Sequence, residues 1–201
     1  LVIHGGNKLY GTEFAVPSDR IVAGTYLMAC IGTGGCVLLE GAPADEMAAV
    51  LEAASRMGAS CWTTEEGICI QSSGCPKAVE RLTTLPYPGF PTDLQSVLLA
   101  ALSTASGMSF IEEKIFEARF QIVEELRKMG ASISSEDSFA LIDGDARLHG
   151  ARVEAKELRG GAALIMAALA AEGETCISGM EYVCRGYENI NEDLKNLGIM
   201  L

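Results

Sequence analysis

Asp93 stands at the end of a stiff stretch of sequence, "LPYPGFPTDLQ", which spans residues 85–95. Proline restricts φ and glycine permits positive φ, so three prolines and a glycine predict a rigid loop rather than the interior of a strand. Thr92 and Asp93 precede a hydrophobic run that begins near Leu94, and their simplest role is to cap a helix. The loop could also hold the Asp93 carboxylate where a substrate binds, as a general base. The stretch itself leaves both roles open.

Four arginines stand where we predict that helices begin: Arg20, Arg119, Arg159 and Arg185. A cation in the first turn opposes the helix dipole by about 0.3–1 kcal/mol, whereas backbone N–H groups and a guanidinium together suit a phosphate or carboxylate. Each arginine could instead pair with an acid nearby in the sequence, namely Asp19, Glu117, Glu157 or Glu188. Because the four occupy equivalent places of an internal repeat, we interpret them as an anion-binding face. Arg20 is the weakest member, since an acid directly precedes it.

The composition limits the classes of partner. The 201 residues include 15 lysines and arginines against 27 acidic residues, a net charge of −12, which argues against nucleic acid. No hydrophobic run could span a bilayer and no secretion signal is found, so we expect no membrane partner. Seven scattered cysteines without a C-x-x-C pair, and only two histidines, argue against a disulfide framework or a metal site. We therefore expect a cytoplasmic protein.

Three stretches of the chain, beginning at residues 23, 93 and 157, are similar to one another. Each contains an apolar helix-like run, a glycine, a short apolar strand and an amphipathic helix that ends at a second glycine. The two glycines of each stretch lie 23, 23 and 25 residues apart: Gly35 and Gly58, Gly107 and Gly130, Gly173 and Gly198. This spacing predicts three copies of one α-β-α unit, joined by additional strands.

The two helices of each unit differ in polarity. The second is amphipathic, with apolar residues at helical spacing in 47–54 and in 122–129. The first, as in "QSVLLAAL" and "ALIMAALAA", is apolar nearly all round, so other parts of the protein must enclose it. Short strands are predicted at 36–41, 67–72, 109–113, 139–144, 151–155 and 175–179. We predict an α/β fold, an inside-out barrel with three helices at the centre and the strands outside them.

Several of these segments resemble the UDP-N-acetylglucosamine enolpyruvyl transferases. They are, in chain order, "SDRIVAGTYLMA", "GAPADEMAAVLEAASRMGA", "PYPGFPTDLQ", "FEARF" with "LRKMGA", "ELRGGAALIMAALAAEGET" and "RGYENI". The resemblance covers essentially the whole chain, and the blocks around Asp93 and Arg185 distinguish it from the enzymes that make enolpyruvylshikimate phosphate. It implies one domain, over residues 1–201, with three βαβαββ repeats near 1–75, 76–147 and 148–201. The cleft between two such domains would bind the substrates.

The resemblance also implies an activity, the first committed step of bacterial peptidoglycan synthesis. The enolpyruvyl group would pass from phosphoenolpyruvate to the 3-hydroxyl of UDP-N-acetylglucosamine, with release of phosphate and without a metal or an organic cofactor. Asp93 would contact the accepting hydroxyl as its general base, and we predict that it has both roles, the start of a helix and contact with the sugar.

Five other residues match substrate-binding positions of this family. Ile115 and Phe116 match positions that contact the nucleotide sugar. Arg119, Arg159 and Arg185 match arginines that line the cleft, and the last two are expected near the phosphoenolpyruvate anion. Guanidinium groups there would hold and orient a substrate that carries a phosphate and a carboxylate.

The resemblance covers only about the second half of such an enzyme. The family's Lys-Asn pair and the mobile loop with its catalytic Cys or Asp belong to the other domain, and neither is found here. Cys30 and Cys36 fall in a buried unit, and Cys184 replaces a usual Asp beside Arg185. We therefore expect the other domain of the same enzyme as a partner, and a chain that folds without turning over substrate.

Other functions stay open at this stage. The chain could belong to a non-catalytic paralogue that binds a nucleotide sugar or an anion. It could belong to another enolpyruvyl transferase, such as 3-phosphoshikimate 1-carboxyvinyltransferase, or to an enzyme of RNA ends, which the negative charge disfavours. It could also be a structural module in which every arginine is paired with an acid.

Overall fold

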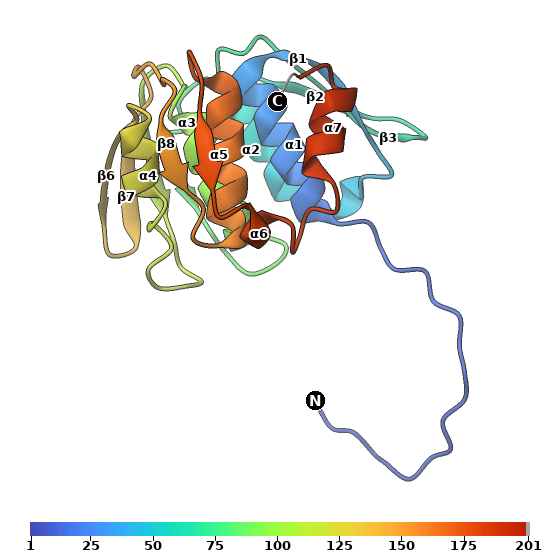
Figure 1. The fold of residues 1–201 in the computed structure, drawn as a ribbon. Coiled ribbons are helices and arrows are strands. Elements are labelled where there is room, and N and C mark those ends of the chain that lie inside the picture. The colour runs from blue at the N-terminus through green and yellow to red at the C-terminus, as the bar shows by residue number, and fades with distance from the viewer. Residues whose placement is uncertain (200–201) are drawn as a thin grey trace.

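Three apolar helices form the centre of the computed structural model, which describes residues 1–199. They are α1 (Arg20–Thr33), α3 (Gln95–Leu102) and α5 (Leu158–Ala170), and they pack against one another (Figure 1). Every residue of α3 is buried, as expected of a helix without a polar face. Burial of these side chains contributes to the hydrophobic stabilisation of the fold.

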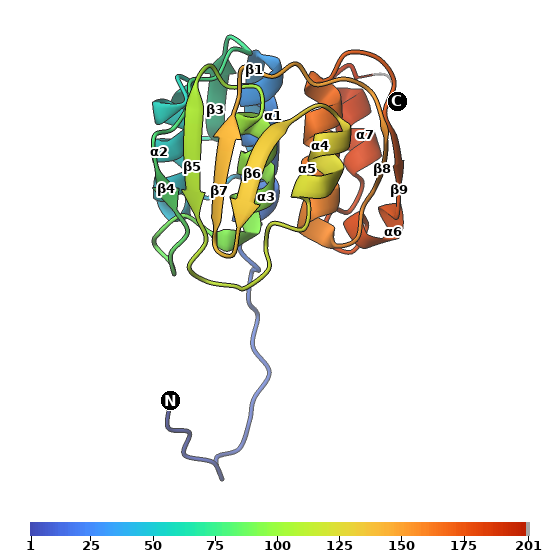
Figure 2. The same cartoon turned by 90° about the vertical axis from the view of Figure 1, so that its left-hand side faces the viewer.

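Three sheets lie outside the central helices, and Figure 2 shows the largest in front of α3. The first contains, in spatial order, β1 (Gly35–Glu40), β3 (Gly67–Ser72) and β2 (Ser60–Thr63), all antiparallel. The second contains β4 (Leu82–Thr83), β5 (Met108–Glu112), β7 (Phe139–Asp143) and β6 (Ser132–Glu136). The third pairs β8 (Arg152–Glu154) with β9 (Cys176–Ser178) in parallel. The predicted fold class, with helices inside and strands outside, is confirmed.

The remaining helices lie nearer the surface. They are α2 (Ala48–Arg56), α4 (Val123–Lys128), α6 (Met180–Val183), α7 (Ile190–Asn196) and the short 3-10 helices η1 (Ala44–Glu46) and η2 (Thr92–Leu94). In α2, α4 and α7 the chain turns at the predicted glycine, and Gly58 and Gly130 have φ of 90° and 93°. The residue after each glycine donates a hydrogen bond to the carbonyl five residues earlier: Ala59 to Ala54, Ala131 to Leu126 and Ile199 to Leu194. This shared ending explains why a glycine follows each of these helices.

The elements fall into three repeats: α1 to β3, β4 to β7, and β8 to α7. The limits expected near residues 75 and 147 fall in the segments that connect them. Within residues 1–199, only the second repeat has the full βαβαββ order, because the first begins at α1 and the third ends at α7. Strands β2, β4 and β6 were not predicted, since β4 has two residues and "SCWT" and "SISSE" carry few buried apolar side chains. No helix in the described part of the chain is both long and apolar enough to cross a membrane.

A buried carboxylate ties β4 to β5 in the second repeat. Glu112 is 7% exposed, and its Oε2 accepts hydrogen bonds from Arg81 Nη2 at 2.6 Å and Thr83 Oγ1 at 3.1 Å. Its Oε1 lies 3.2 Å from Lys114 Nζ. The Arg81 guanidinium is the main reason that the pKa of Glu112 falls to about 2.

A carboxyl whose pKa is lowered by folding stabilises the fold above its unfolded pKa, and that stabilisation disappears as the pH falls toward the folded pKa. We therefore expect Glu112→Gln to lower the free energy of unfolding at pH 7. The difference from the unsubstituted chain should shrink between about pH 4.5 and about pH 2. Urea unfolding across this pH range measures it, with Glu52→Gln on the exposed face of α2 as the control. A difference that does not change with pH would contradict this account.

Candidate active site

Asp93 lies between two arginines that come from different parts of the chain. Its Oδ1 lies 2.9 Å from Arg119 Nη2, in the same repeat, and its Oδ2 lies 3.3 Å from Arg159 Nη2, in the third repeat. The side chains of Asp93, Arg119 and Arg159 are 39%, 21% and 16% exposed. The cluster is therefore open to solvent on one side, as a ligand site must be.

Three acids stand at the beginnings of the three central helices, and only two of them act as caps. Asp19 Oδ1 accepts the backbone N–H groups two and three residues later, at 2.7 and 3.2 Å. Glu157 accepts the equivalent two groups at the start of α5. Asp93 makes no such bond in residues 1–199, and its carboxylate faces the two arginines instead. The predicted capping role of Asp93 is wrong, because η2 begins after Pro91 and leads into α3 without a side-chain cap.

Thr92 does not cap the helix either, since its Oγ1 donates to Glu113 Oε2 at 2.9 Å. The other oxygen of Glu113 accepts the backbone N–H groups of Ile115 and Phe116, at 2.8 and 3.1 Å. Buried Glu113, 3% exposed, thus joins the loop before Asp93 to the turn that leads to Arg119. Sequence analysis missed this residue, although its place at the end of an apolar strand beside Glu112 was a signal.

Backbone hydrogen bonds and one buried side chain hold the proline-rich loop, which is consistent with the predicted rigid loop. Leu85 N–H donates to the Phe90 carbonyl at 3.0 Å, and Gly89 N–H donates to the Pro86 carbonyl at 2.8 Å. Phe90 is 4% exposed and anchors the loop in the core. A Cβ at Gly89 would lie 2.5 Å from Leu85 Cβ, so the turn needs glycine there. This loop positions Asp93 beside Arg119 and Arg159.

The positions of the arginines differ in part from the prediction. Arg20 opens α1 and Arg159 is the second residue of α5, as expected, but Arg119 precedes α4 by four residues and Arg185 follows α6. In the described part of the chain none of the four pairs with its neighbouring acid, so the alternative of local ion pairs is wrong. Arg20 lies over the Tyr87 ring at 5.1 Å. The exposed Arg185 lies over Tyr182 at 5.2 Å and makes no contact with Asp93 within residues 1–199.

Ile115 and Phe116 form the turn beside Arg119. Phe116 is 56% exposed, and the Arg119 guanidinium carbon lies 5.0 Å from the centre of its ring. This cation–π contact orients Arg119 toward Asp93. The structure therefore brings together Asp93, Phe116, Arg119 and Arg159, with Ile115 in the adjoining turn and Arg185 apart from them.

Arg159 keeps one hydrogen-bonding group without a partner. Its Nη1 is buried and has no acceptor among residues 1–199, although buried polar atoms are normally paired. Nearby, the hydroxyl of buried Tyr187 lies 2.8 Å from Thr25 Oγ1, and burial raises the pKa of Tyr187. The unpaired guanidinium nitrogen of Arg159 is suited to an anionic oxygen.

Outside this cluster, residues 1–199 also contain cysteines, histidines and other potential metal ligands. All seven cysteines are free. In residues 1–199 no group of three or more His, Cys, Asp or Glu side chains could hold a metal ion.

Known proteins are similar to this chain over most of its length. The family model for EPSP synthase (3-phosphoshikimate 1-carboxyvinyltransferase) matches residues 1–194. The UDP-N-acetylglucosamine 1-carboxyvinyltransferase of Desulfofundulus thermocisternus is 43% identical over 197 residues, which cover 98% of this chain and 81% of that protein. The chain belongs to this enolpyruvyl transferase family. The UDP-N-acetylglucosamine 1-carboxyvinyltransferase 2 of Caldanaerobacter subterraneus is 44% identical over 98% of this chain and 48% of its own length. The chain thus spans about half the length of several of these relatives.

Solved structures of enolpyruvyl transferases have the same fold. The enolpyruvyl transferase NikO from Streptomyces tendae matches 90% of this chain and 43% of its own, with a TM-score of 0.81 and 26% identity. An EPSP synthase from Acinetobacter baumannii matches 95% of this chain and 48% of its own, with a TM-score of 0.75. At 22% identity the second match supports the fold alone.

The different roles of the helix-opening acids predict different effects on stability. Asp19→Ala removes a cap and should lower the free energy of unfolding by about 1–2 kcal/mol. Asp93→Ala removes only ion pairs that solvent screens and should cost about 0.5 kcal/mol or less. Urea unfolding of the two variants provides the comparison. An equal or larger loss for Asp93→Ala would show that Asp93 is a structural residue.

Proposed function

We propose that this chain is the part of a UDP-N-acetylglucosamine 1-carboxyvinyltransferase that holds the acceptor sugar and one side of phosphoenolpyruvate. The release of Asp93 from helix capping, and its position between Arg119 and Arg159, carry this proposal. The names of relatives at 42–45% identity favour UDP-N-acetylglucosamine over shikimate 3-phosphate as the acceptor.

In the proposed reaction, Asp93 is the general base for the 3-hydroxyl of the sugar. The two arginines occupy two of the roughly four acceptor sites of a carboxylate, so Asp93 can still accept a hydrogen bond from the hydroxyl. The hydroxyl oxygen attacks the central carbon of phosphoenolpyruvate as the methylene carbon gains a proton, and Asp93 takes the proton of the hydroxyl. Loss of phosphate, together with a proton from the new methyl group, restores the double bond in the product.

The arginines have separate roles in this proposal. The unpaired Nη1 of Arg159 donates to an oxygen of phosphoenolpyruvate. Arg119 orients Asp93 and faces the cleft, and exposed Arg185 binds the substrate anion from its own segment. Ile115 and the exposed ring of Phe116 contact the nucleotide sugar. These contacts place the reacting groups next to one another before any bond changes.

We further propose that residues 1–201 form one domain of the enzyme and that a second domain supplies the acid that protonates the methylene carbon. Because this chain spans 48% of the length of its Caldanaerobacter relative, the partner domain is expected in the same polypeptide. Without it the chain should bind but not turn over substrate. We also propose a cytoplasmic location and a role in peptidoglycan synthesis, and the seven free cysteines support a reducing compartment.

Asp93→Asn tests the proposed base in the complete reading frame that contains this chain. Asparagine keeps the shape of the side chain but cannot take a proton, so turnover should fall about 10²–10⁴-fold. Phosphate release with phosphoenolpyruvate and UDP-N-acetylglucosamine measures it. The matched control is Asp19→Asn, at the equivalent position of the first repeat, where asparagine still caps the helix.

Two results would contradict the proposal. Unchanged turnover by Asp93→Asn would exclude Asp93 as the base. Turnover of the unsubstituted enzyme with shikimate 3-phosphate but not with UDP-N-acetylglucosamine would assign a different acceptor, and no turnover with either would favour a non-catalytic paralogue.

Arg185→Ala tests whether the exposed arginine binds the substrate anion. Loss of a charge-assisted hydrogen bond should raise KM for phosphoenolpyruvate about tenfold or more, while the melting temperature stays the same because Arg185 is exposed. Arg147→Ala, at another exposed arginine, is the control. A lower melting temperature with an unchanged KM would show that Arg185 has a structural role.

A further inference from the structure

Two buried hydroxyl groups join the first repeat to the third in the neighbourhood of Arg159. The hydroxyl of Tyr187, which is 2% exposed, lies 2.8 Å from Oγ1 of the fully buried Thr25 in α1. Thr25 in turn donates to the carbonyl of Ile21, one turn earlier in α1, at 2.9 Å. A threonine hydroxyl has a single hydrogen, and Thr25 uses it for this carbonyl. Tyr187 is therefore the donor in its bond to Thr25.

The segment that carries Tyr187 packs against the beginning of α5. A Cβ at Gly186 would lie 2.8 Å from Leu158 Cδ2, so glycine permits this close approach to the residue that directly precedes Arg159. Burial raises the pKa of Tyr187, and the hydrogen bond with Thr25 and the charge of Arg159 oppose that increase. An effect of the Arg159 charge on the phenol requires the two groups to be close neighbours. Tyr187 thus lies between α1 and the guanidinium of Arg159.

The guanidinium of Arg159 is held by the protein only in part. Its Nη2 lies 3.3 Å from Asp93 Oδ2, whereas its buried Nη1 has no acceptor in the described part of the chain. A long arginine side chain has many rotamers, so a second contact is needed to fix its direction. The Tyr187 hydroxyl directs its own hydrogen to Thr25, and its oxygen therefore keeps lone pairs for a neighbouring cation.

We propose that Tyr187 is a positioning residue, whose hydroxyl, fixed by Thr25, holds the Arg159 guanidinium so that Nη1 faces the substrate anion. This inference rests on the proposed function, in which Nη1 binds phosphoenolpyruvate. Tyr187 is too buried to touch the substrate, so it acts on the reaction only through other side chains. It also anchors the turn that carries Arg185, since Tyr187 N–H donates to the Val183 carbonyl at 3.1 Å.

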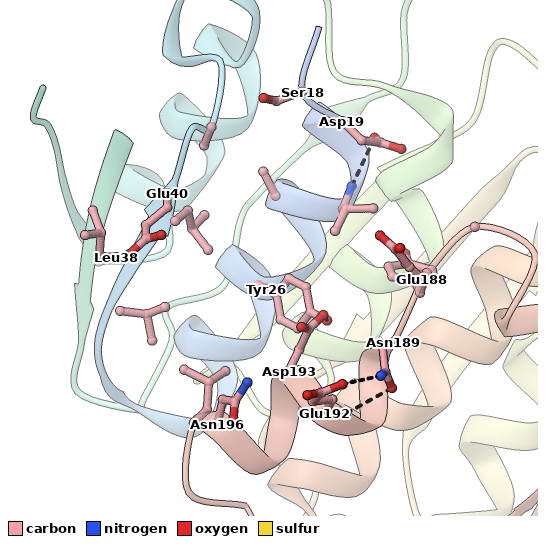
Figure 3. Close-up of a pocket in the computed structure, with 18 residues that line it drawn as sticks. Ser18, Asp19, Tyr26, Leu38, Glu40, Glu188, Asn189, Glu192, Asp193 and Asn196 are labelled. Carbon is pink, nitrogen blue, oxygen red and sulfur yellow. Dashed lines mark hydrogen bonds between the residues drawn. The ribbon is translucent and has the colours of Figure 1, made fainter. Parts of the chain in front are cut away.

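A second tyrosine provides a matched control. Tyr26, the residue after Thr25, also joins the first repeat to the third, because its hydroxyl donates to Asp193 Oδ2 of α7 at 2.5 Å. Figure 3 shows this pair in a groove between β1, α1 and α7. The bond ties α1 to α7 rather than to α5. Its loss should therefore weaken the same two repeats without changing the direction of Arg159.

Nitrogen NMR of the arginine side chains in the 1–201 chain tests the positioning itself, without any substrate. Rotation about the Nε–Cζ bond exchanges the Nη1 and Nη2 signals, and it is slow in a guanidinium that is held in place. Tyr187→Phe keeps the ring but removes the hydroxyl, so exchange at Arg159 should become about five- to tenfold faster. Thr25→Val removes the acceptor that fixes the hydroxyl, should act in the same direction, and replaces Tyr187→Phe if that variant does not fold. Tyr26→Phe should leave the exchange unchanged.

Steady-state kinetics of the complete enzyme tests the consequence for the substrate. Tyr187→Phe should raise KM for phosphoenolpyruvate about five- to tenfold. Both kcat and KM for UDP-N-acetylglucosamine should stay within about twofold, because a weaker contact in the bound ground state raises only the KM of its own substrate and Arg119 still contacts Asp93. A residue that only stabilised the fold would not separate the two substrates. Tyr26→Phe should leave all three constants unchanged.

Three results would overturn the inference. One is exchange at Arg159 that is as slow in Tyr187→Phe as in the unsubstituted chain. Another is faster exchange together with an unchanged KM for phosphoenolpyruvate. The third is an equal rise in this KM in Tyr26→Phe, which would make the effect one of general stability. Absence of turnover by the unsubstituted enzyme would instead contradict the proposed function, and the NMR exchange would still decide whether Tyr187 positions Arg159.

Discussion

The contact of Asp93 with Arg119 and Arg159 is the interaction on which this account depends. It joins the beginnings of α3 and α5 and places a carboxylate and two guanidinium groups at one end of the central helices. Partly exposed ion pairs add little stability, and burial of the hydrophobic core, to which the central helices and the surrounding elements both contribute, supplies more. α3 begins without a side-chain cap, and the Asp93 carboxylate contacts the two arginines instead.

Each repeat has an acid at the beginning of its central helix, but the three acids have different roles. Asp19 and Glu157 accept hydrogen bonds from the first N–H groups of α1 and α5, whereas Asp93 contacts Arg119 and Arg159, and Glu113 holds the loop that precedes it. A three-fold scaffold thus gives three similar positions, of which one can change its role while the other two maintain the structure.

The fold was predictable from the sequence because its signals are local. Glycines with positive φ end the amphipathic helices at regular intervals, and apolar runs such as "QSVLLAAL" mark helices with no solvent-facing side. The candidate site was predictable only in part, because its geometry depends on contacts between residues far apart in the chain. Asp93 and Arg159 are 66 residues apart, and nothing in the neighbourhood of Asp93 shows that it leaves its helix uncapped. The buried anchor Glu113 and the short strand β4 depend in the same way on neighbours from other segments.

A crystal structure of the complete enzyme with UDP-N-acetylglucosamine bound tests the central claim most directly. The account predicts the 3-hydroxyl oxygen of the sugar within about 2.6–3.2 Å of an Asp93 carboxylate oxygen, the range in which a base can take its proton. A sugar whose 3-hydroxyl contacts a different residue, with Asp93 still held by both arginines and out of its reach, would contradict it.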